Sequence, residues 1–77
     1  MVELHILVDT GPGEMWEAIK QIQEFQEIAR AQLVMGPYDI IALARLKSVK
    51  SVKRLLDEIH AVRGVTRTET CMVMSLA

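Results

Sequence analysis

The residue with the most conspicuous chemistry in the sequence is Asp39, a carboxylate placed between a turn and an apolar run. Gly36-Pro37 predicts the turn, and the run from Ile40 to Ala44 predicts a mostly buried strand. Tyr38, one of three aromatic residues in the chain, stands directly before the acid. An acid at such a junction either accepts hydrogen bonds from nearby backbone, as in an Asx-type turn, or binds a ligand or a neighbouring chain. The sequence leaves both interpretations of Asp39 open.

The other potentially reactive side chains form no recognised pattern. His5, His60 and Cys71 lack the close spacing of a metal site, so we expect no metal and no cofactor. A single cysteine excludes a disulfide within the chain, and we expect Cys71 to be a small buried side chain. His5 with Asp39 is the one plausible acid–base pair, which is little for an active site. The sequence therefore predicts no catalytic residue.

Hydrophobic periodicity predicts the elements that position these residues. Apolar residues alternate with others in four segments, which we expect to be strands over residues 2–8, 28–35, 38–46 and 66–75. Apolar residues at helical spacing predict one helix starting at Met15 and a second between Val49 and Val62. Ser48 is a suitable N-cap for the second helix, and Gly64 suits a left-handed residue after it.

The order of these elements, β-α-β-β-α-β, predicts an α+β, ferredoxin-like fold with a four-stranded antiparallel sheet and two helices on one face. An internal repeat agrees with this assignment. The residues Ile22, Phe25, Ile28 and Arg30 recur 37 positions later as Ile59, Val62, Val65 and Arg67. Each half of the chain is therefore one β-α-β unit with the same exit from helix to strand.

The face of the sheet without helices is predicted to be partly apolar. In the third strand we expect Tyr38, Ile40, Ala42 and Ala44 to share one face, with Ile41 and Leu43 on the other. In the first strand, Leu7 is expected on the face opposite to that of Leu4 and Ile6. Such an exposed patch usually marks an interface, and 77 residues make a marginal core for one domain. We therefore expect a homodimer in which two sheets stack as a dimeric α/β-barrel-like assembly.

Charge and hydropathy exclude several classes of function. The net charge is −1, without the basic stripe of a protein that binds nucleic acid directly. The longest uninterrupted apolar run, Ile40 to Ala44, is far below the ~20 residues of a membrane span. The N-terminal residues lack the pattern of a signal peptide. We expect a cytoplasmic protein that does not associate with membranes.

Two segments carry a resemblance to a known family. Gly36-Pro37-Tyr38-Asp39-Ile40-Ile41 resembles the G-x-[YF]-D-[IL] hairpin of the ligand-sensing domain of Lrp/AsnC (feast/famine) transcription regulators. The segment from Ala61 to Thr70 resembles the helix exit and last strand of that domain, where Gly-Val precedes a T-x-T pattern. The resemblance extends over nearly all 77 residues. It implies a stand-alone RAM domain spanning residues 1–77, without the helix-turn-helix of full regulators.

The resemblance also implies a function and a site. It implies a non-enzymatic module for amino-acid sensing and oligomerisation in transcription regulation. In the family such domains form dimers that assemble further, commonly as an octamer, and the effector binds between dimers. The site residues that carry over are Gly36, Tyr38, Asp39, Thr68 and Thr70. Asp39 suits the ammonium of an amino acid, and the threonine hydroxyls suit its carboxylate. Further partners would be full-length Lrp/AsnC regulators. The alternative function is a small dimeric enzyme of the monooxygenase or isomerase type on the same fold.

Overall fold

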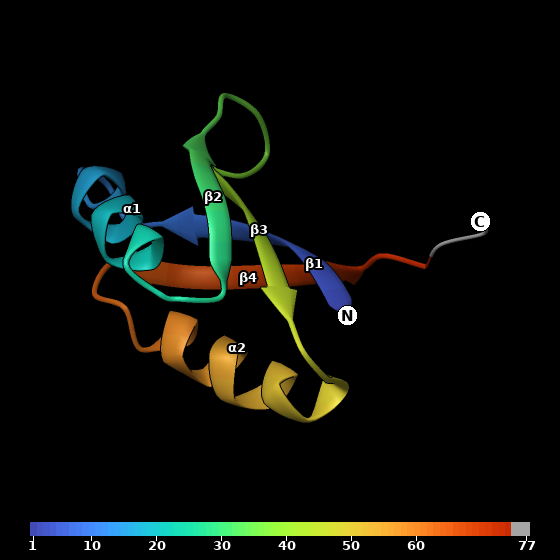
Figure 1. Cartoon of the computed structure of the whole chain (residues 1–77). Coiled ribbons are helices and arrows are strands. Elements are labelled where there is room, and N and C mark those ends of the chain that lie inside the picture. The colour runs from blue at the N-terminus through green and yellow to red at the C-terminus, as the bar shows by residue number, and fades with distance from the viewer. Residues whose placement is uncertain (75–77) are drawn as a thin grey trace.

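The structure, a computed structural model, describes residues 1–74 and has the predicted order of elements (Figure 1). The elements are β1 (Val2–Thr10), α1 (Met15–Gln23), β2 (Ile28–Leu33), β3 (Ile40–Leu46), the 3-10 helix η1 (Val49–Ser51), α2 (Val52–His60) and β4 (Val65–Met72). The four strands form one antiparallel sheet in the order β2-β3-β1-β4, so that β1 and β3 are central and β2 and β4 are the edges. This is the ferredoxin-like arrangement, and the predicted fold class is confirmed.

One face of the sheet carries the hydrophobic core. Alternate residues of the central strands are buried there, and buried residues of both helices belong to the same cluster, so both helices cover this face. The largest fully buried side chains are Leu4, Ile6, Val8, Ile22, Ile40, Leu55 and Ile59. Each of them stabilises the fold by roughly 1.5–3 kcal/mol through removal of apolar surface from water.

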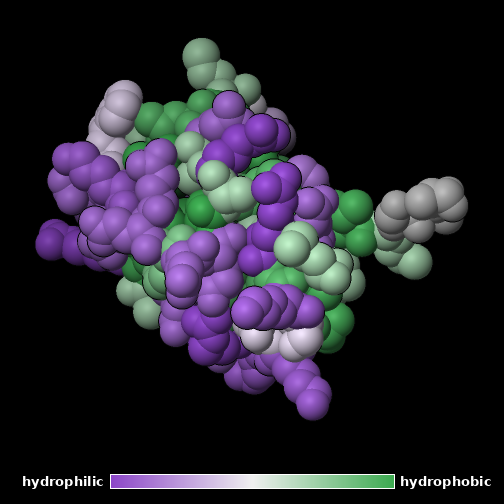
Figure 2. Space-filling view, in the orientation of Figure 1, coloured by the Kyte–Doolittle hydropathy of each residue, from purple (hydrophilic) through white to green (hydrophobic). Residues whose placement is uncertain are grey.

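The other face of the sheet is only partly apolar, as predicted. Leu7, Ile41 and Leu43 are half-buried on it, with Leu7 opposite Ile41 in the register of β1 and β3. We call these three residues the open face. Exposed apolar side chains also occur at and directly after the end of β4, namely Met72, Val73 and Met74. Figure 2 shows hydrophobic and hydrophilic side chains mixed over the face of the molecule that it presents. Two sheets of this kind have apolar surface to bury against each other.

The two strands of the hairpin are shorter than predicted. β2 ends at Leu33 and β3 begins at Ile40, because residues 34–39 form a loop closed by a bond from the Val34 N–H to the Asp39 carbonyl (2.9 Å). Since Tyr38 precedes β3, strand alternation does not fix its direction. The prediction that it shares the face of Ile40 is wrong, since its ring lies against a side chain on the opposite face of the sheet.

Three further predictions in the second half of the chain are wrong, namely those for Ser48, Val49 and Cys71. Ser48 makes no side-chain cap bond, because a 3-10 turn precedes α2. Val49, predicted as the first of the apolar residues that the second helix buries, lies in that turn and is exposed. Cys71 is exposed, because it lies on the edge strand β4 on the face away from the helices. β4 ends at Met72, and the predicted strand end at Ser75 lies outside the described residues.

The internal repeat corresponds to two equivalent turns in the structure. After α1, the Phe25 N–H donates to Ile22 and the Ile28 N–H to Phe25 (3.2 and 3.0 Å). After α2, the same bonds join Val62 to Ile59 and Val65 to Val62 (3.1 and 3.2 Å). The repeated residues therefore reflect a repeated exit from helix to strand, in which two apolar side chains anchor each turn against the core.

Gly64 has the left-handed conformation that the sequence predicts, with φ +94°. It lies at the end of the second of these turns, directly before β4. Its carbonyl accepts a bond from the Gly11 N–H (2.9 Å), which joins the turn to the loop between β1 and α1. A Cβ added to Gly64 would lie 2.6 Å from the Cβ of Glu14, so both the conformation and the space require glycine here.

Candidate functional site

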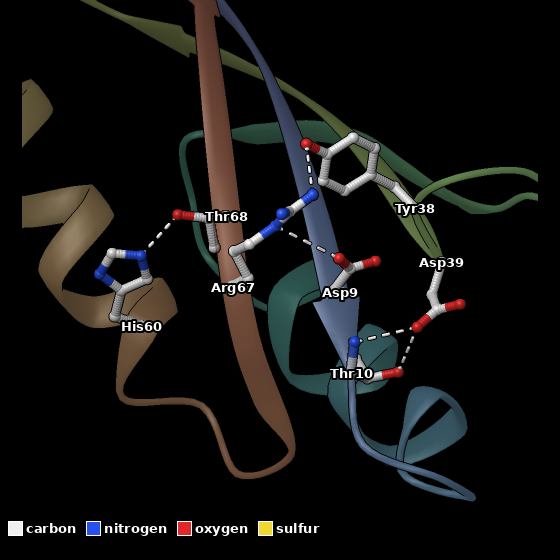
Figure 3. Close-up of polar contacts among 7 residues, drawn as sticks. All are labelled: Asp9, Thr10, Tyr38, Asp39, His60, Arg67 and Thr68. Carbon is white, nitrogen blue, oxygen red and sulfur yellow. Dashed lines mark hydrogen bonds and ion pairs between the residues drawn. The ribbon is translucent and has the colours of Figure 1, made fainter.

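Asp39 is tied to the end of β1. Its Oδ2 accepts hydrogen bonds from both the backbone N–H and the hydroxyl of Thr10, each at 2.9 Å (Figure 3). Its own N–H donates to the Val8 carbonyl (3.0 Å), which continues the pairing of the two central strands by one residue. The half-buried carboxylate therefore closes the base of the hairpin loop onto β1. Both side-chain bonds use Oδ2, so Oδ1 keeps capacity to accept further bonds.

Tyr38, beside it, contacts β4 across β1. The Arg67 guanidinium lies 5.1 Å from the centroid of the Tyr38 ring, and Nη2 donates to the Tyr38 hydroxyl (2.9 Å). Arg67 Nε also lies 3.5 Å from Asp9 Oδ2 (Figure 3). A hydrogen bond to the Glu69 carboxylate is the main cause that raises the pKa of the Tyr38 hydroxyl above its usual value, with partial burial adding to it and Arg67 opposing it. We call Asp9, Tyr38, Arg67 and Glu69 the rim cluster.

Gly36 lies at the exposed part of the hairpin loop. A Cβ added there would meet no atom within 4 Å, and its φ is not positive. Neither space nor conformation therefore requires glycine at this position in the single chain.

Thr68 and Thr70 share one face of β4, as their spacing predicts, but it is the face that carries the core. Their register partners in β1 are Val8 and Ile6, whose side chains are buried beneath the helices. The Thr68 hydroxyl forms a hydrogen bond with Nε2 of His60 at the end of α2. Figure 3 shows Thr68 pointing toward α2 while Arg67, the next residue, points toward Tyr38.

The structure thus brings Tyr38 and Asp39 together with groups that the sequence did not predict as site residues, namely Asp9, Thr10 and Arg67. Within the single chain it does not bring the two threonines onto the same side of the sheet as Arg67. A signal for Arg67 was present, because it is adjacent to the T-x-T segment and alternates with the threonines. Its contact with Tyr38, 29 residues away, depends on the register of three strands.

The acid–base pair considered from the sequence is not a pair in the structure. Asp39 bonds to Val8, which lies three residues along β1 from His5. At about 3.3 Å per strand residue, roughly 10 Å of strand separates the two positions, too far for a direct hydrogen bond. Among residues 1–74, no group of three or more His, Cys, Asp and Glu side chains is arranged to hold a metal ion.

A shallow pocket of about 320 Å³ lies at the opposite end of the sheet from Asp39. It is lined by Gln26, Glu27, Arg45, Leu46, Lys47 and Ser51. An ion pair joins Glu27 to Arg54 of α2 beside it. The pKa of the Glu27 carboxyl lies below its usual value, first because of a backbone hydrogen bond and then because of Arg54, although burial opposes the shift. None of the predicted site residues lines this pocket.

Within the described part of the chain, no helix is long and apolar enough to cross a membrane. The longest helices, α1 and α2, span nine residues each.

Comparison with known proteins gives a consistent assignment. The family model described as the Lrp/AsnC ligand binding domain matches residues 3–76. A Thermus thermophilus protein, TTHA0845, is 29% identical with a TM-score of 0.94, and the match covers 100% of this chain and 98% of that one. The hypothetical protein PHS023 from Pyrococcus horikoshii is 25% identical with a TM-score of 0.90, covering 97% and 92% of the two chains.

A structure with lower sequence identity has the same fold within a longer protein. The transcriptional regulator NMB0573 of Neisseria meningitidis, solved as a complex with L-Met, matches with a TM-score of 0.84 at 15% identity. The match covers 97% of this chain but 51% of that regulator. The comparison with curated proteins gave no match.

Proposed function

The chain belongs to the Lrp/AsnC ligand binding domain family, and we propose that it is a non-enzymatic module that binds a small amino acid and controls assembly in transcription regulation. The observation that carries the proposal is the family match over residues 3–76, within which the polar groups at the base of the hairpin lie. The L-Met complex of the Neisseria regulator supports an amino acid as the class of ligand.

Asp39 is the proposed contact for the ammonium group of the effector. Its Oδ1 is available for a charge-assisted hydrogen bond while Thr10 holds Oδ2. The fixed carboxylate does not have to lose rotamer freedom when the ligand arrives, which favours affinity. Tyr38 and the exposed backbone around Gly36 complete the proposed contacts from the hairpin. Thr68 and Thr70 contribute in this proposal through the opposite side of β4, toward a neighbouring dimer.

Assembly is the second part of the proposal. Two open faces stack to form a homodimer with an α/β-barrel-like core, and dimers combine further, as an octamer or with full-length Lrp/AsnC regulators. Burial of Leu7, Ile41 and Leu43 supplies the driving force, at roughly 25 cal/mol per Å² of apolar surface. An effector that binds between dimers favours one assembly state, by no more than its differential affinity for the two states. We place this function in the cytoplasm, where amino-acid pools are sensed.

Gel filtration and titration calorimetry against the twenty amino acids test the proposal. We expect an assembly larger than the monomer and binding of at least one amino acid. Asp39→Asn, which keeps the shape and an acceptor for Thr10 but removes the charge, should weaken that binding about tenfold. Asp57→Asn is the matched control, because Asp57 lies on α2 and pairs there with Lys53. A strict monomer that binds none of the twenty amino acids would refute the proposal.

A further inference from the structure

Arg67 occupies a central position in the rim cluster. It projects from β4 on the face opposite Thr68, and its register partner across the strand pair is Asp9. Its guanidinium crosses β1 to reach the Tyr38 ring and hydroxyl (Figure 3). Arg67 contacts Asp9 and Asp39 contacts Thr10, so the guanidinium and the Asp39 carboxylate lie at adjacent residues at the end of β1.

The contacts of Arg67 fix its position without using up its hydrogen-bonding capacity. A guanidinium has five N–H groups. One on Nη2 is donated to Tyr38 (2.9 Å), and the one on Nε points to Asp9 at 3.5 Å, which is long for a hydrogen bond. The three remaining N–H groups suffice for a bidentate bond to a carboxylate, and the side chain is 60% exposed.

Two other arginines of the described chain are more tightly paired. Arg45 binds Glu3 at 2.9 Å, and Arg54 binds both Glu27 and Glu58. Their guanidinium charge is neutralised by close carboxylates, whereas the ion pair of Arg67 is long. Arg67 is instead held by a ring and a hydroxyl, an arrangement that orients a guanidinium and leaves its charge available.

The charges around Arg67 limit the kind of ligand that fits. Asp9 lies 3.5 Å from the guanidinium, Asp39 contacts the next residue of β1, and Glu69 contacts the Tyr38 hydroxyl that Arg67 also binds. Acidic groups therefore outnumber the one guanidinium at this end of the sheet, which disfavours a simple anion. A zwitterion avoids this repulsion, because its ammonium group pairs with Asp39 while its carboxylate pairs with Arg67. We propose that Arg67 binds the α-carboxylate of the effector and that the site selects zwitterionic amino acids over simple carboxylic acids and over amines.

This inference rests on the proposed function and revises one part of it, since the sequence assigned the carboxylate to Thr68 and Thr70. Within a single chain those hydroxyls lie on the far side of β4. Arg67 lies on the side of Tyr38, and a guanidinium binds a carboxylate more strongly than two neutral hydroxyls do.

Calorimetry with three probes tests the assignment. The first probe is the amino acid that binds most tightly among the twenty. The second is its primary amide, which lacks the carboxylate, and the third is the corresponding acid without the amino group. For the unaltered protein we expect both analogues to bind at least about tenfold more weakly than the amino acid. Arg67→Met should weaken amino-acid binding about tenfold and abolish the preference for the amino acid over its amide.

Two controls make the result specific. Arg45→Met removes an arginine from the same face at the other end of the sheet and should leave all three affinities unchanged. Circular dichroism reports whether Arg67→Met folds; if it does not, Arg67→Gln gives the same comparison with a polar side chain.

If Arg67→Met keeps the preference for the amino acid over its amide, the inference is overturned while amino-acid sensing stands. Binding of none of the twenty amino acids by the unaltered protein overturns both.

Discussion

Substitution of three glycines by alanine separates backbone strain from steric conflict in this fold. Gly64 has φ +94°, and an added Cβ would lie 2.6 Å from the Cβ of Glu14. Gly13 has φ +75°, but an added Cβ would meet nothing within 4 Å. Gly36 has neither a positive φ nor a neighbour within 4 Å. An alanine would therefore meet both backbone strain and steric conflict at Gly64, backbone strain alone at Gly13, and neither at Gly36.

The expected losses of unfolding free energy follow from these values. A non-glycine residue in the left-handed region costs roughly 1–2 kcal/mol, so Gly13→Ala should lose about that amount. Gly64→Ala carries the same strain and also displaces Glu14, whose Cβ is fixed by the backbone at the N-terminus of α1, so we expect a loss of about 3 kcal/mol or more. Gly36→Ala should change stability by less than about 1 kcal/mol, or stabilise slightly by restricting the unfolded chain.

Urea denaturation followed by circular dichroism measures the three losses, at one protomer concentration because assembly adds to apparent stability. A second substitution identifies the conflict. Glu14→Gly removes the opposing Cβ and should recover part of the loss in Gly64→Ala. Glu14→Ala keeps that Cβ and, of the atoms close to the added one, removes only Cγ and Oε2, which lie at 3.3 and 3.2 Å, so it should recover less. Equal losses for Gly13→Ala and Gly64→Ala, or equal recovery by both changes at Glu14, would refute the steric argument.

Three more predictions concern the site, the open face and the ion pair of Glu27. Thr10→Val removes one hydrogen bond to Asp39 and should lower the unfolding free energy by about 1 kcal/mol, with Thr10→Ser retaining most of it in thermal denaturation. Ile41→Lys places a charge on the open face and should shift gel filtration toward the monomer; an unchanged elution volume would contradict the stacked-sheet dimer. Because the pKa of Glu27 is lower in the folded than in the unfolded chain, its stabilising effect is present above the unfolded value of about 4.3 and disappears as pH falls through the folded pKa. The difference in unfolding free energy between the unaltered protein and Glu27→Gln should therefore shrink between pH 7 and pH 3, and a difference that stays constant would contradict the assignment.

The sequence predicts the local features of this fold because their causes are local. Strand alternation identified the two faces of β1 and β3, and helical spacing identified the buried side of α1. The repeat of Ile22 and Phe25 as Ile59 and Val62 identified two equivalent turns, because the same short backbone pattern needs the same apolar anchors. Errors arose where a neighbouring element decided the outcome, as at Val49 in the 3-10 turn and at Cys71 on the edge strand.

The candidate site also combines features that follow from the local sequence with features that depend on distant parts of the chain. The sequence indicated Asp39 as a residue with two possible roles, and the hairpin motif indicated Tyr38 beside it. It did not predict that Thr10 would hold one oxygen of Asp39, because 29 residues separate them in the chain. The internal bond and a ligand role for Asp39 are compatible, since the bond uses Oδ2 alone.

The sequence by itself determined the order of the elements, the apolar faces and the glycine of the second turn, since these follow from periodicity and backbone conformation within a few residues. Tertiary structure alone decided which side chains meet at the rim. Alternation places Arg67 and Thr68 on opposite faces of β4, but only the register of β4 against β1 decides which of them faces Tyr38. That register shifts between Asp9 and Thr10, at the level of the site, and it is set by pairing between distant segments of the chain.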